Sequence, residues 1–279
     1  MKRFLIFLYR TSRPRFWLYL GGTYVVGFAA GAANVQAFTE LYFWVYLFFF
    51  LVPANIFLYG VNDYYDADTD RFNSKKGHEE NLLQVNERKK MHLTLLVITG
   101  LYAVIILLTR SAALGSLFGI FLVLSYFYSA PPLRFKARPI VDFASNILYG
   151  LPGCIGYVQT TGHLPPWPVC LAVFFWTSAM HLFSAIPDIE SDAKAGLTTS
   201  AILFGQKASL YACSLFWSAS LVIFVSILHV YWLGAICLVY PLVPLFLVGR
   251  PELLQRVYWY FPAYNAVVGF ALFGVAILH

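Results

Sequence analysis

The 279-residue sequence has few charged residues, only 11%, against 60% apolar residues, and its mean hydropathy is +0.69. Soluble globular domains carry about 25% charged and about 45 to 50% apolar residues. The composition therefore excludes an ordinary water-soluble protein. At about 20 apolar residues per membrane-spanning helix, the chain has room for about eight to ten spans and for no sizeable soluble domain.

The sequence also lacks closely spaced cysteines. Its four cysteines lie far apart in apolar stretches, which favours small buried side chains over a disulfide framework or a zinc site. The net charge of +6 does not indicate nucleic-acid binding, because the basic residues border apolar runs. Arginines interrupt the apolar N-terminal segment and no small-residue cleavage site follows, so we interpret this segment as a cytoplasmic tail and not as a signal peptide.

Apolar runs of spanning length recur along the whole chain. They predict an all-α, polytopic membrane protein with nine transmembrane helices, at approximately 16–37, 41–61, 91–109, 112–129, 141–161, 167–187, 208–228, 230–248 and 258–278. The tail and the even-numbered loops between these spans hold 18 of the 19 Lys and Arg residues, and Arg110 is the exception. By the positive-inside rule the N-terminus is cytoplasmic.

An acidic cluster, NDYYDADTD, stands at the cytoplasmic end of the second predicted span. On a continuing helix, Asp63, Asp66 and Asp70 share one face with Asn62. Three carboxylates on one face repel one another unless a cation neutralises them, and oxygen ligands favour a hard ion such as Mg²⁺. A solvated acidic loop is the alternative interpretation.

A second acidic cluster stands at the cytoplasmic end of the sixth predicted span, where Asp188 and Asp192 are i, i+4 neighbours. Two acidic faces at one membrane depth could hold Mg²⁺ ions that bridge to substrate phosphates, and a diphosphate ester fits this arrangement. The repetition also suggests two related parts, about 1–140 and 141–279, within a single domain spanning 1–279.

Basic and aromatic residues near the clusters fit the same chemistry. Arg71, Arg134, Lys136 and Lys194 are candidate diphosphate contacts, although each could equally be a membrane-flanking charge. Metal ions and these cations would stabilise a departing diphosphate, and the allylic cation left behind needs a dry site with aromatic faces. The candidate pocket tyrosines near cytoplasmic span ends are Tyr59, Tyr126, Tyr128 and Tyr149.

These motifs resemble those of the UbiA-type intramembrane prenyltransferases. The run from Asn62 to Asp70 is similar to their NDxxDxxxD signature, and Asp188 to Asp192 followed by Gly196 is similar to their DxxxD signature. The resemblance implies nine helices around a central cavity. It also implies catalytic and Mg²⁺-binding roles for Asp63, Asp66, Asp188 and Asp192, with Asp70 as a further metal ligand. Asn62, Arg71 and Lys194 would contact the diphosphate.

The segment from Tyr128 to Pro139, followed by Asp142, resembles the loop of the carotenoid-elongating branch, the lycopene elongases. Tyr128, Arg134 and Lys136, already candidates from their position and chemistry, lie in this loop and are expected to bind substrate. The resemblance implies transfer of a dimethylallyl group to a carotenoid such as lycopene, in carotenoid biosynthesis. The segment His78 to Asn81 departs from the Arg-Pro-rich stretch of quinone-pathway members, which argues against an aromatic acceptor.

Three other functions remain open at this point. One is a UbiA-type enzyme with a quinone precursor or polar lipid as acceptor. Another is a cation transporter, whose carboxylates would be expected near mid-membrane and not at span ends. The third is a noncatalytic scaffold whose acidic loops recruit a partner protein, for which single Asp-to-Asn changes would cause little functional loss. In either enzymatic reading the partners are a prenyl diphosphate donor, a hydrophobic isoprenoid acceptor and the lipid bilayer. No sequence feature points to nucleic acid or a protein partner. Short loops favour a prokaryotic plasma membrane, with the site facing the cytoplasm.

Overall fold

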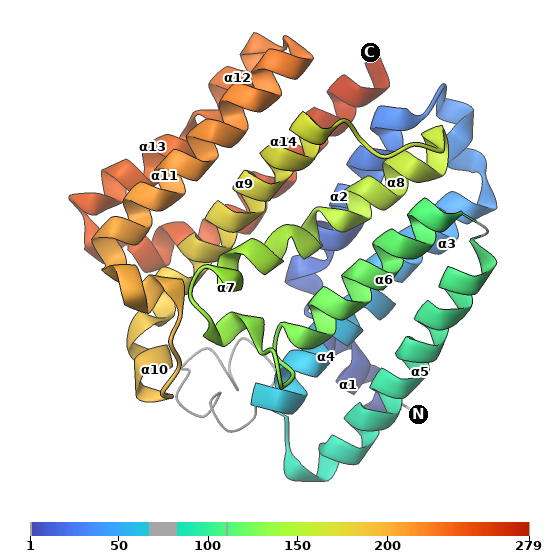
Figure 1. Cartoon of the computed structure of the whole chain (residues 1–279), viewed down its shortest axis with the longest axis horizontal. Helices are drawn as coiled ribbons and strands as arrows, with labels where there is room; N and C mark the ends of the chain where they lie inside the picture. Colours follow the sequence, from blue (N-terminus) through green and yellow to red (C-terminus); the bar gives the residue numbers. More distant parts are fainter. Residues whose placement is uncertain (1, 67–82, 110, 279) are drawn as a thin grey trace. The chain divides into compact units, whose positions relative to one another are not determined.

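The computed structural model describes residues 2–66, 83–109 and 111–278, and within these ranges all regular elements are helices (Figure 1). The expected all-α class is confirmed. The chain forms two compact units, of which the first comprises Met1–Arg134 with Leu151–Leu164, and the second Phe135–Gly150 with Pro165–His279.

The first unit contains seven α-helices: α1 (Lys2–Thr11), α2 (Trp17–Gly31), α3 (Leu41–Leu51), α4 (Pro53–Asp66), α5 (Arg88–Leu108), α6 (Ala112–Phe127) and α8 (Leu151–Thr161). Short 3-10 turns precede three of them: η1 (Pro14–Phe16), η2 (Val35–Thr39) and η4 (Val85–Glu87). Pro53 separates α3 from α4 because proline has no N–H to continue the helix. The Asn55 amide compensates by donating to the Phe50 and Leu51 carbonyls at 2.7 and 3.0 Å.

Glycines allow α2 and α8 to pack closely along their length. A Cβ at Gly27 would overlap the backbone of Gly153, and a Cβ at Gly156 would overlap the backbone of Tyr24 and Phe28. Small residues spaced in this way are typical of helix interfaces in membranes, where close backbone approach and van der Waals packing replace the hydrophobic effect. The α2–α8 contact is therefore a backbone-to-backbone interface.

Aromatic side chains fill the remaining space of the first unit. Tyr24 and Phe28 on α2 meet Phe43 on α3, with ring centroids 5.7 and 4.7 Å from Phe43. The Tyr24 hydroxyl donates to Gln159 Oε1 on α8 at 2.8 Å, which satisfies a polar group in a fully buried position. This aromatic packing holds α3, the helix that leads directly into α4.

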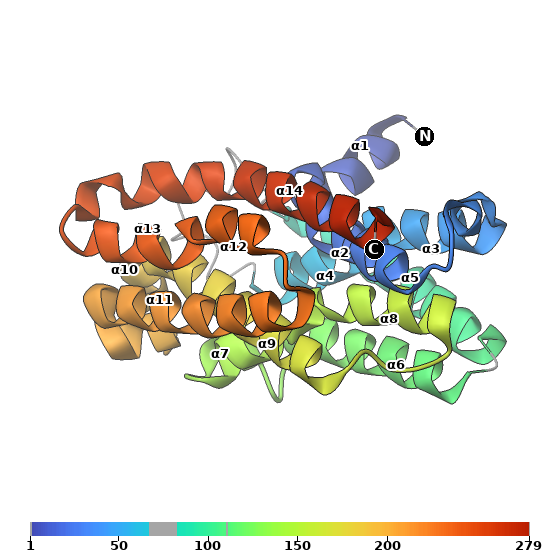
Figure 2. The same cartoon turned by 90° about the horizontal axis from the view of Figure 1, so that it is seen from above.

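The second unit is built from α7 (Val141–Ala144), α9 (Trp167–Ala185), α10 (Ile189–Lys194), α11 (Ser200–Leu228), α12 (Tyr231–Cys237), α13 (Val239–Val248) and α14 (Leu254–Leu278). Its 3-10 turns are η5 (Phe135–Ala137), η6 (Ser145–Tyr149), η7 (Ile186–Asp188) and η8 (Pro251–Leu253). Helix α11 packs against both α9 and α13, and α12 packs against α14 (Figure 2).

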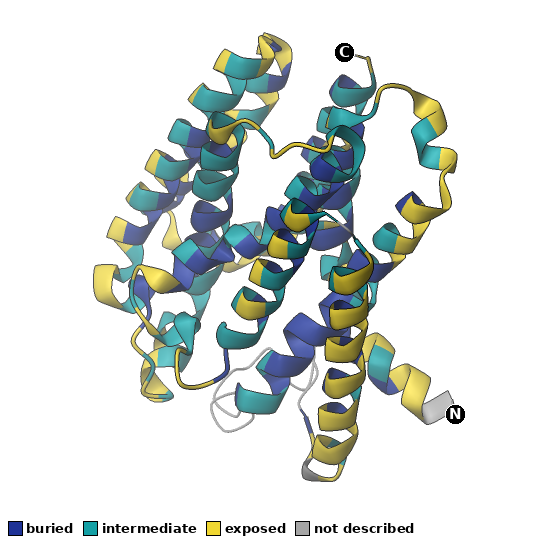
Figure 3. Ribbon diagram, turned by 45° about the vertical axis from the view of Figure 1, so that its right-hand side comes forward, coloured by how far each residue is buried: buried dark blue, intermediate teal, exposed yellow. Residues whose placement is uncertain are grey.

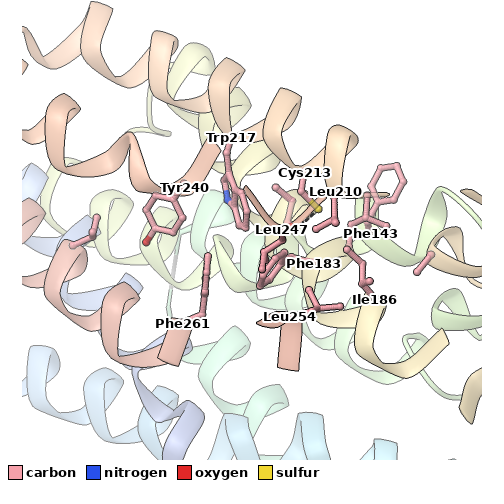
Figure 4. Close-up of a cluster of buried hydrophobic side chains, with 14 residues drawn as sticks. Phe143, Phe183, Ile186, Leu210, Cys213, Trp217, Tyr240, Leu247, Leu254 and Phe261 are labelled. Carbon is pink, nitrogen blue, oxygen red and sulfur yellow. Dashed lines mark hydrogen bonds between the residues drawn. The ribbon is translucent and has the colours of Figure 1, made fainter. Parts of the chain in front are cut away.

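A large buried cluster holds the second unit together (Figure 4). Phe183 of α9, Trp217 of α11 and Phe261 of α14 lie with ring centroids 4.7 to 5.6 Å apart. Tyr240 of α13 joins them, and its hydroxyl donates to Asn265 Oδ1 at 2.6 Å. The cluster fixes α9, which leads directly into the second acidic motif.

The prediction of one continuous helix over 141–161 is wrong. The segment forms α7, η6 and then α8, and its two ends belong to different units. Two features explain the break. Pro152 has no N–H to donate within a helix. Asp142 is fully buried and fastens α7 to the start of α11, accepting hydrogen bonds from the N–H and the hydroxyl of Ser200 at 2.6 and 2.5 Å.

The hydrogen bonds between Asp142 and Ser200, here called the Asp142 clamp, hold a strained stretch of backbone. Ile140 has a positive φ of 72°, which is unfavourable for a β-branched residue. Its N–H donates to Ser200 Oγ at 2.7 Å, so the bonds that satisfy Asp142 also secure this residue. The carboxylate lies at the N-terminus of α11, where the helix dipole favours negative charge.

Six helical segments are long and apolar enough to cross a membrane: Leu41–Asp66, Arg88–Leu108, Trp167–Lys194, Ser200–Leu228, Tyr231–Val248 and Pro251–Leu278. Ala112–Phe127 is apolar but shorter. Exposed residues occur along several helices (Figure 3). They include large apolar side chains such as Leu107 on α5, at 79% exposed, and Phe270 on α14, at 77%. Such surfaces suit contact with lipid. The described residues thus support an integral membrane protein with at least six spans.

Replacing Gly27 by Ala should lower the stability of the protein, because the added Cβ meets backbone that cannot move away; overpacking costs about 1 to 3 kcal/mol. Gly119→Ala on α6 is the matched control, since nothing lies within 4 Å of its added Cβ. It should be neutral or slightly stabilising because Ala favours helix. Thermal unfolding in detergent micelles would measure both, and equal midpoints for the two variants would contradict the close α2–α8 packing.

Asp142→Ala should destabilise the second unit by about 2 to 4 kcal/mol, because it leaves buried donors of Ser200 without an acceptor. Glu190→Ala, which removes an exposed carboxylate on α10, should have little effect. Unfolding midpoints of the two variants would be compared with that of the parent protein. A parent-like midpoint for Asp142→Ala would show that the clamp contributes no stability.

Candidate active site

The last turns of α4 carry the first acidic motif. Asp63 and Asp66 are both fully buried, and Asn62 is half-buried beside them. A buried carboxylate is costly unless a cation or several hydrogen bonds compensate its charge. The solvated acidic loop considered from the sequence is therefore wrong for these two residues.

Asp66 is held by Asn62 of the same helix and by Arg134, which follows α6. One carboxylate oxygen accepts a hydrogen bond from Asn62 Nδ2 at 2.7 Å, and the other is 3.1 Å from Arg134 Nη2. Asn62 Nδ2 also lies 3.1 Å from the hydroxyl of Ser129, just beyond the end of α6. Asn62 and Arg134, both predicted as substrate contacts, thus meet at Asp66, and Ser129 lies beside Asn62.

Asp63 is held by Arg13, a residue that the sequence did not single out. Arg13 Nη2 lies 2.8 Å from Asp63 Oδ1 and 3.4 Å from Asn62 Oδ1, and its guanidinium stands 4.5 Å from the centre of the Tyr59 ring. From the sequence, Arg10, Arg13 and Arg15 are assigned alike to the cytoplasmic tail. Nothing in their spacing indicates which of them contacts α4.

The arginines that hold the two aspartates share an unusual backbone. Arg13 has φ of 47° and Arg134 has φ of 40°, both in the left-handed region that non-glycine residues rarely adopt. Strain of this kind persists only where surrounding contacts fix the residue, and it concentrates at functional sites. The turns at Arg13 and Arg134 each direct a guanidinium group toward α4.

Tyrosines surround the first motif. Tyr65 and Tyr126 form a hydroxyl-to-hydroxyl hydrogen bond of 2.8 Å between α4 and α6. Tyr59 is buried under Arg13, while the predicted substrate contact Tyr128 is half-buried at the end of α6. The first unit therefore places Tyr126 and Tyr128 near the end of α6 and Tyr59 in the middle of α4, whereas Tyr149 lies in η6 of the second unit.

The second motif has a different local structure. Asp188 ends η7 and Asp192 lies in α10, and both are half-exposed. Gly196, at φ of 72°, ends α10: its N–H bonds the Ala193 carbonyl, and the Leu197 N–H bonds the Asp192 carbonyl, each at 3.0 Å. This is a Schellman motif, which explains why a glycine follows the second acidic pair.

Two predicted basic contacts also lie in the second unit. Lys136 is half-buried in η5, and Lys194 is exposed in the last turn of α10. Asp70 and Arg71 lie outside the described residues. Among the residues that the structure describes, no three His, Cys, Asp or Glu side chains gather as a metal cluster.

The donor atoms of each motif nevertheless suit Mg²⁺. Both motifs present carboxylate oxygens, the ligands that hard divalent ions prefer. In the first motif, cationic groups already stand 2.8 and 3.1 Å from Asp63 and Asp66, so positive charge at both carboxylates is compatible with the surrounding packing. Asp63, Asp66, Asp188 and Asp192 could therefore hold Mg²⁺.

Known sequences resemble this chain over most of its length. It is 39% identical over 266 residues to a lycopene elongase/hydratase of Haloferax volcanii, covering 95% of this chain and 86% of that protein. It is 40% identical over 270 residues to a lycopene elongase/hydratase of Haloarcula japonica, covering 94% and 88%.

A solved structure shares the fold. A UbiA homologue from Archaeoglobus fulgidus, bound to DMAPP and Mg²⁺, matches with a TM-score of 0.70 at 23% identity, over 95% of this chain and 98% of that one. The model of the UbiA prenyltransferase family matches residues 20–259. The chain therefore belongs to the UbiA prenyltransferase family, and the protein is a membrane prenyltransferase.

Proposed function

We propose that the protein transfers a dimethylallyl group from its diphosphate to a carotenoid acceptor such as lycopene, with Mg²⁺ as the cofactor, in carotenoid biosynthesis. The main support for a diphosphate donor is the pair of fully buried aspartates on α4, each held by an arginine. The acceptor is supported by relatives named lycopene elongase/hydratase at 39 and 40% identity. The Archaeoglobus homologue bound to DMAPP and Mg²⁺ supports the donor and the metal.

In this proposal Asp63, Asp66 and Asp70 of the first motif, and Asp188 and Asp192 of the second, are the metal ligands. Mg²⁺ would supply Lewis-acid stabilisation of the departing diphosphate. Asn62 donates to Asp66 and so fixes the orientation of that carboxylate. Arg71, Arg134, Lys136 and Lys194 add positive charge for the diphosphate oxygens, and arginine suits them best through paired N–H donors.

The bond changes follow from the donor and acceptor. The allylic carbon–oxygen bond breaks, and its electron pair leaves with the diphosphate. A terminal double bond of the acceptor donates its electron pair to the allylic carbon, which forms the new carbon–carbon bond. The acceptor cation then loses a proton to the released diphosphate, or adds water and loses a proton from that water to the same base. Tyr128 is proposed to line the acceptor side, where an aromatic face stabilises developing positive charge.

The membrane arrangement is part of the same proposal. We assign nine membrane-spanning segments around a central cavity, a cytoplasmic N-terminus and a cytoplasmic active site in a prokaryotic plasma membrane. The bias of Lys and Arg toward one set of loops supports this orientation. The two compact units are taken as parts of one catalytic domain covering 1–279.

Asp66→Asn should reduce prenyl transfer by about 100-fold or more, because it removes a carboxylate ligand and the charge opposite Arg134. Steady-state rates and thermal unfolding would be measured in the same detergent preparation. Glu190→Gln, which changes an exposed carboxylate between Asp188 and Asp192, is the control and should retain activity. Normal turnover by folded Asp66→Asn would exclude Asp66 from the metal site.

Membranes containing the protein, supplied with Mg²⁺, labelled dimethylallyl diphosphate and lycopene, should yield pigment carrying one or two added five-carbon units. Chelation should stop the transfer, and added Mg²⁺ should restore it, because the diphosphate leaves poorly without the metal. Mass analysis of extracted pigment gives the result. Transfer to a quinone precursor or polar lipid offered in parallel, with none to lycopene, would retain the metal chemistry and refute the carotenoid acceptor.

A further inference from the structure

Two neighbouring residues of α7 hold the second acidic motif at both of its ends. Phe143 belongs to the buried cluster that also contains Ile186, in η7 just before the motif (Figure 4). Asp142 binds Ser200, the first residue of α11, which follows Asp192 by eight residues. The segment that carries the second motif is thus attached to α7 before and after the motif, and all of these residues belong to the second unit.

Backbone bonds and a helix cap connect Asp192 to Ser200. The Asp192 carbonyl accepts the Leu197 N–H at 3.0 Å in the Schellman turn. The Thr199 hydroxyl accepts from the Ile202 N–H at 3.3 Å and so caps α11. Because ordered turns occupy most of the short segment between the two residues, the position of Ser200 restricts that of Asp192.

The loop of residues 135–140, here called the Lys136 loop, is attached to the same serine. Lys136 lies in η5, at the start of this loop, and Ile140 ends it. The Ile140 N–H donates to Ser200 Oγ at 2.7 Å. A positive φ at a β-branched residue such as Ile140 persists only where surrounding contacts hold it. The Ser200 hydroxyl therefore holds the end of the Lys136 loop beside the segment that follows the second motif.

The Ser200 hydroxyl joins two parts of the chain at once. It donates to Asp142 Oδ1 at 2.5 Å while it accepts from the Ile140 N–H. Without this hydroxyl, both oxygens of Asp142 would keep a backbone donor, the Phe143 N–H at 2.8 Å and the Ser200 N–H at 2.6 Å. Loss of the hydroxyl alone would therefore release Ile140 and the Lys136 loop, whereas the buried carboxylate would stay hydrogen-bonded.

We propose that Asp142 and Ser200 are positioning residues of the active site, which hold Lys136 and the carboxylates of the second motif in the arrangement that binds one metal–diphosphate complex. In this proposal neither residue touches the complex, and the Ser200 hydroxyl acts through Lys136. A loop that is already held in place loses less conformational entropy when its side chain binds a ligand, so the hydroxyl raises the affinity for the complex. The inference rests on the metal-dependent function above.

The test measures binding of preformed Mn²⁺–inorganic diphosphate to the full-length protein in detergent by electron paramagnetic resonance. Ser200→Ala should weaken binding about fivefold, the scale of one neutral hydrogen bond. Lys136→Gln should weaken binding about tenfold, the scale of one charge-assisted hydrogen bond. In the double variant the two losses should not add, because the hydroxyl acts through Lys136.

Ser220→Ala is the matched control. It removes another buried serine hydroxyl from α11, where Ser220 Oγ donates to the Ala172 carbonyl at 2.8 Å. It should lower the thermal unfolding midpoint about as much as Ser200→Ala does, since each change removes one buried hydrogen bond. Binding of the metal–diphosphate complex by Ser220→Ala should equal that of the parent protein. Thermal unfolding in the same detergent confirms that each variant is folded.

The outcomes distinguish this inference from the proposed function. Parent-like binding by Ser200→Ala, or equal weakening by Ser220→Ala, would overturn the positioning role. Additive losses in the double variant would overturn the action through Lys136. Unchanged binding by Lys136→Gln would remove Lys136 from the diphosphate site and this inference with it. Failure of the parent protein to bind the complex would overturn the metal-dependent function itself.

Discussion

Neutralisation of the buried carboxylates at the end of α4 is the constraint on which the first unit depends. Asp63 and Asp66 have no exposed surface, so their charges must be balanced within the protein. The balance comes from Arg13, before α2, and Arg134, after α6, each delivered by a left-handed turn. Helix packing must therefore be precise enough to bring segments 121 positions apart in sequence onto neighbouring turns of one helix.

That precision comes from backbone contact and aromatic packing. Gly27 and Gly156 bring α2 against α8, and the Asn55 amide caps the broken end of α3 so that α4 can begin at Pro53. Tyr24 connects three of these helices through its ring and hydroxyl. Interhelical packing of this kind does not depend on exclusion of water, which suits a protein surrounded by lipid.

The helices and part of the candidate site could be predicted from the sequence, because they depend on local residue patterns. Apolar runs specify helices, and the i, i+4 spacing of Asn62 and Asp66 specifies their hydrogen bond. The role of Arg13 could not be predicted, since it depends on a turn conformation and a long-range contact. The break near Gly150 was missed for a related reason: Asp142 reads as the polar start of a span until its partner Ser200, 58 residues later, is known.

The carboxylates of the two acidic motifs differ in burial although the two sequences are similar. Asp63 and Asp66 are fully buried, and a guanidinium nitrogen stands 2.8 or 3.1 Å from one oxygen of each carboxylate. Asp188 and Asp192 are half-exposed, so solvent screens their charges more strongly. Burial raises the strength of a charge interaction but also the cost of breaking it. The charge interactions of the first motif are consequently stronger and costlier to break than those of the second motif, where the Schellman turn at Gly196 fixes the backbone beyond Asp192.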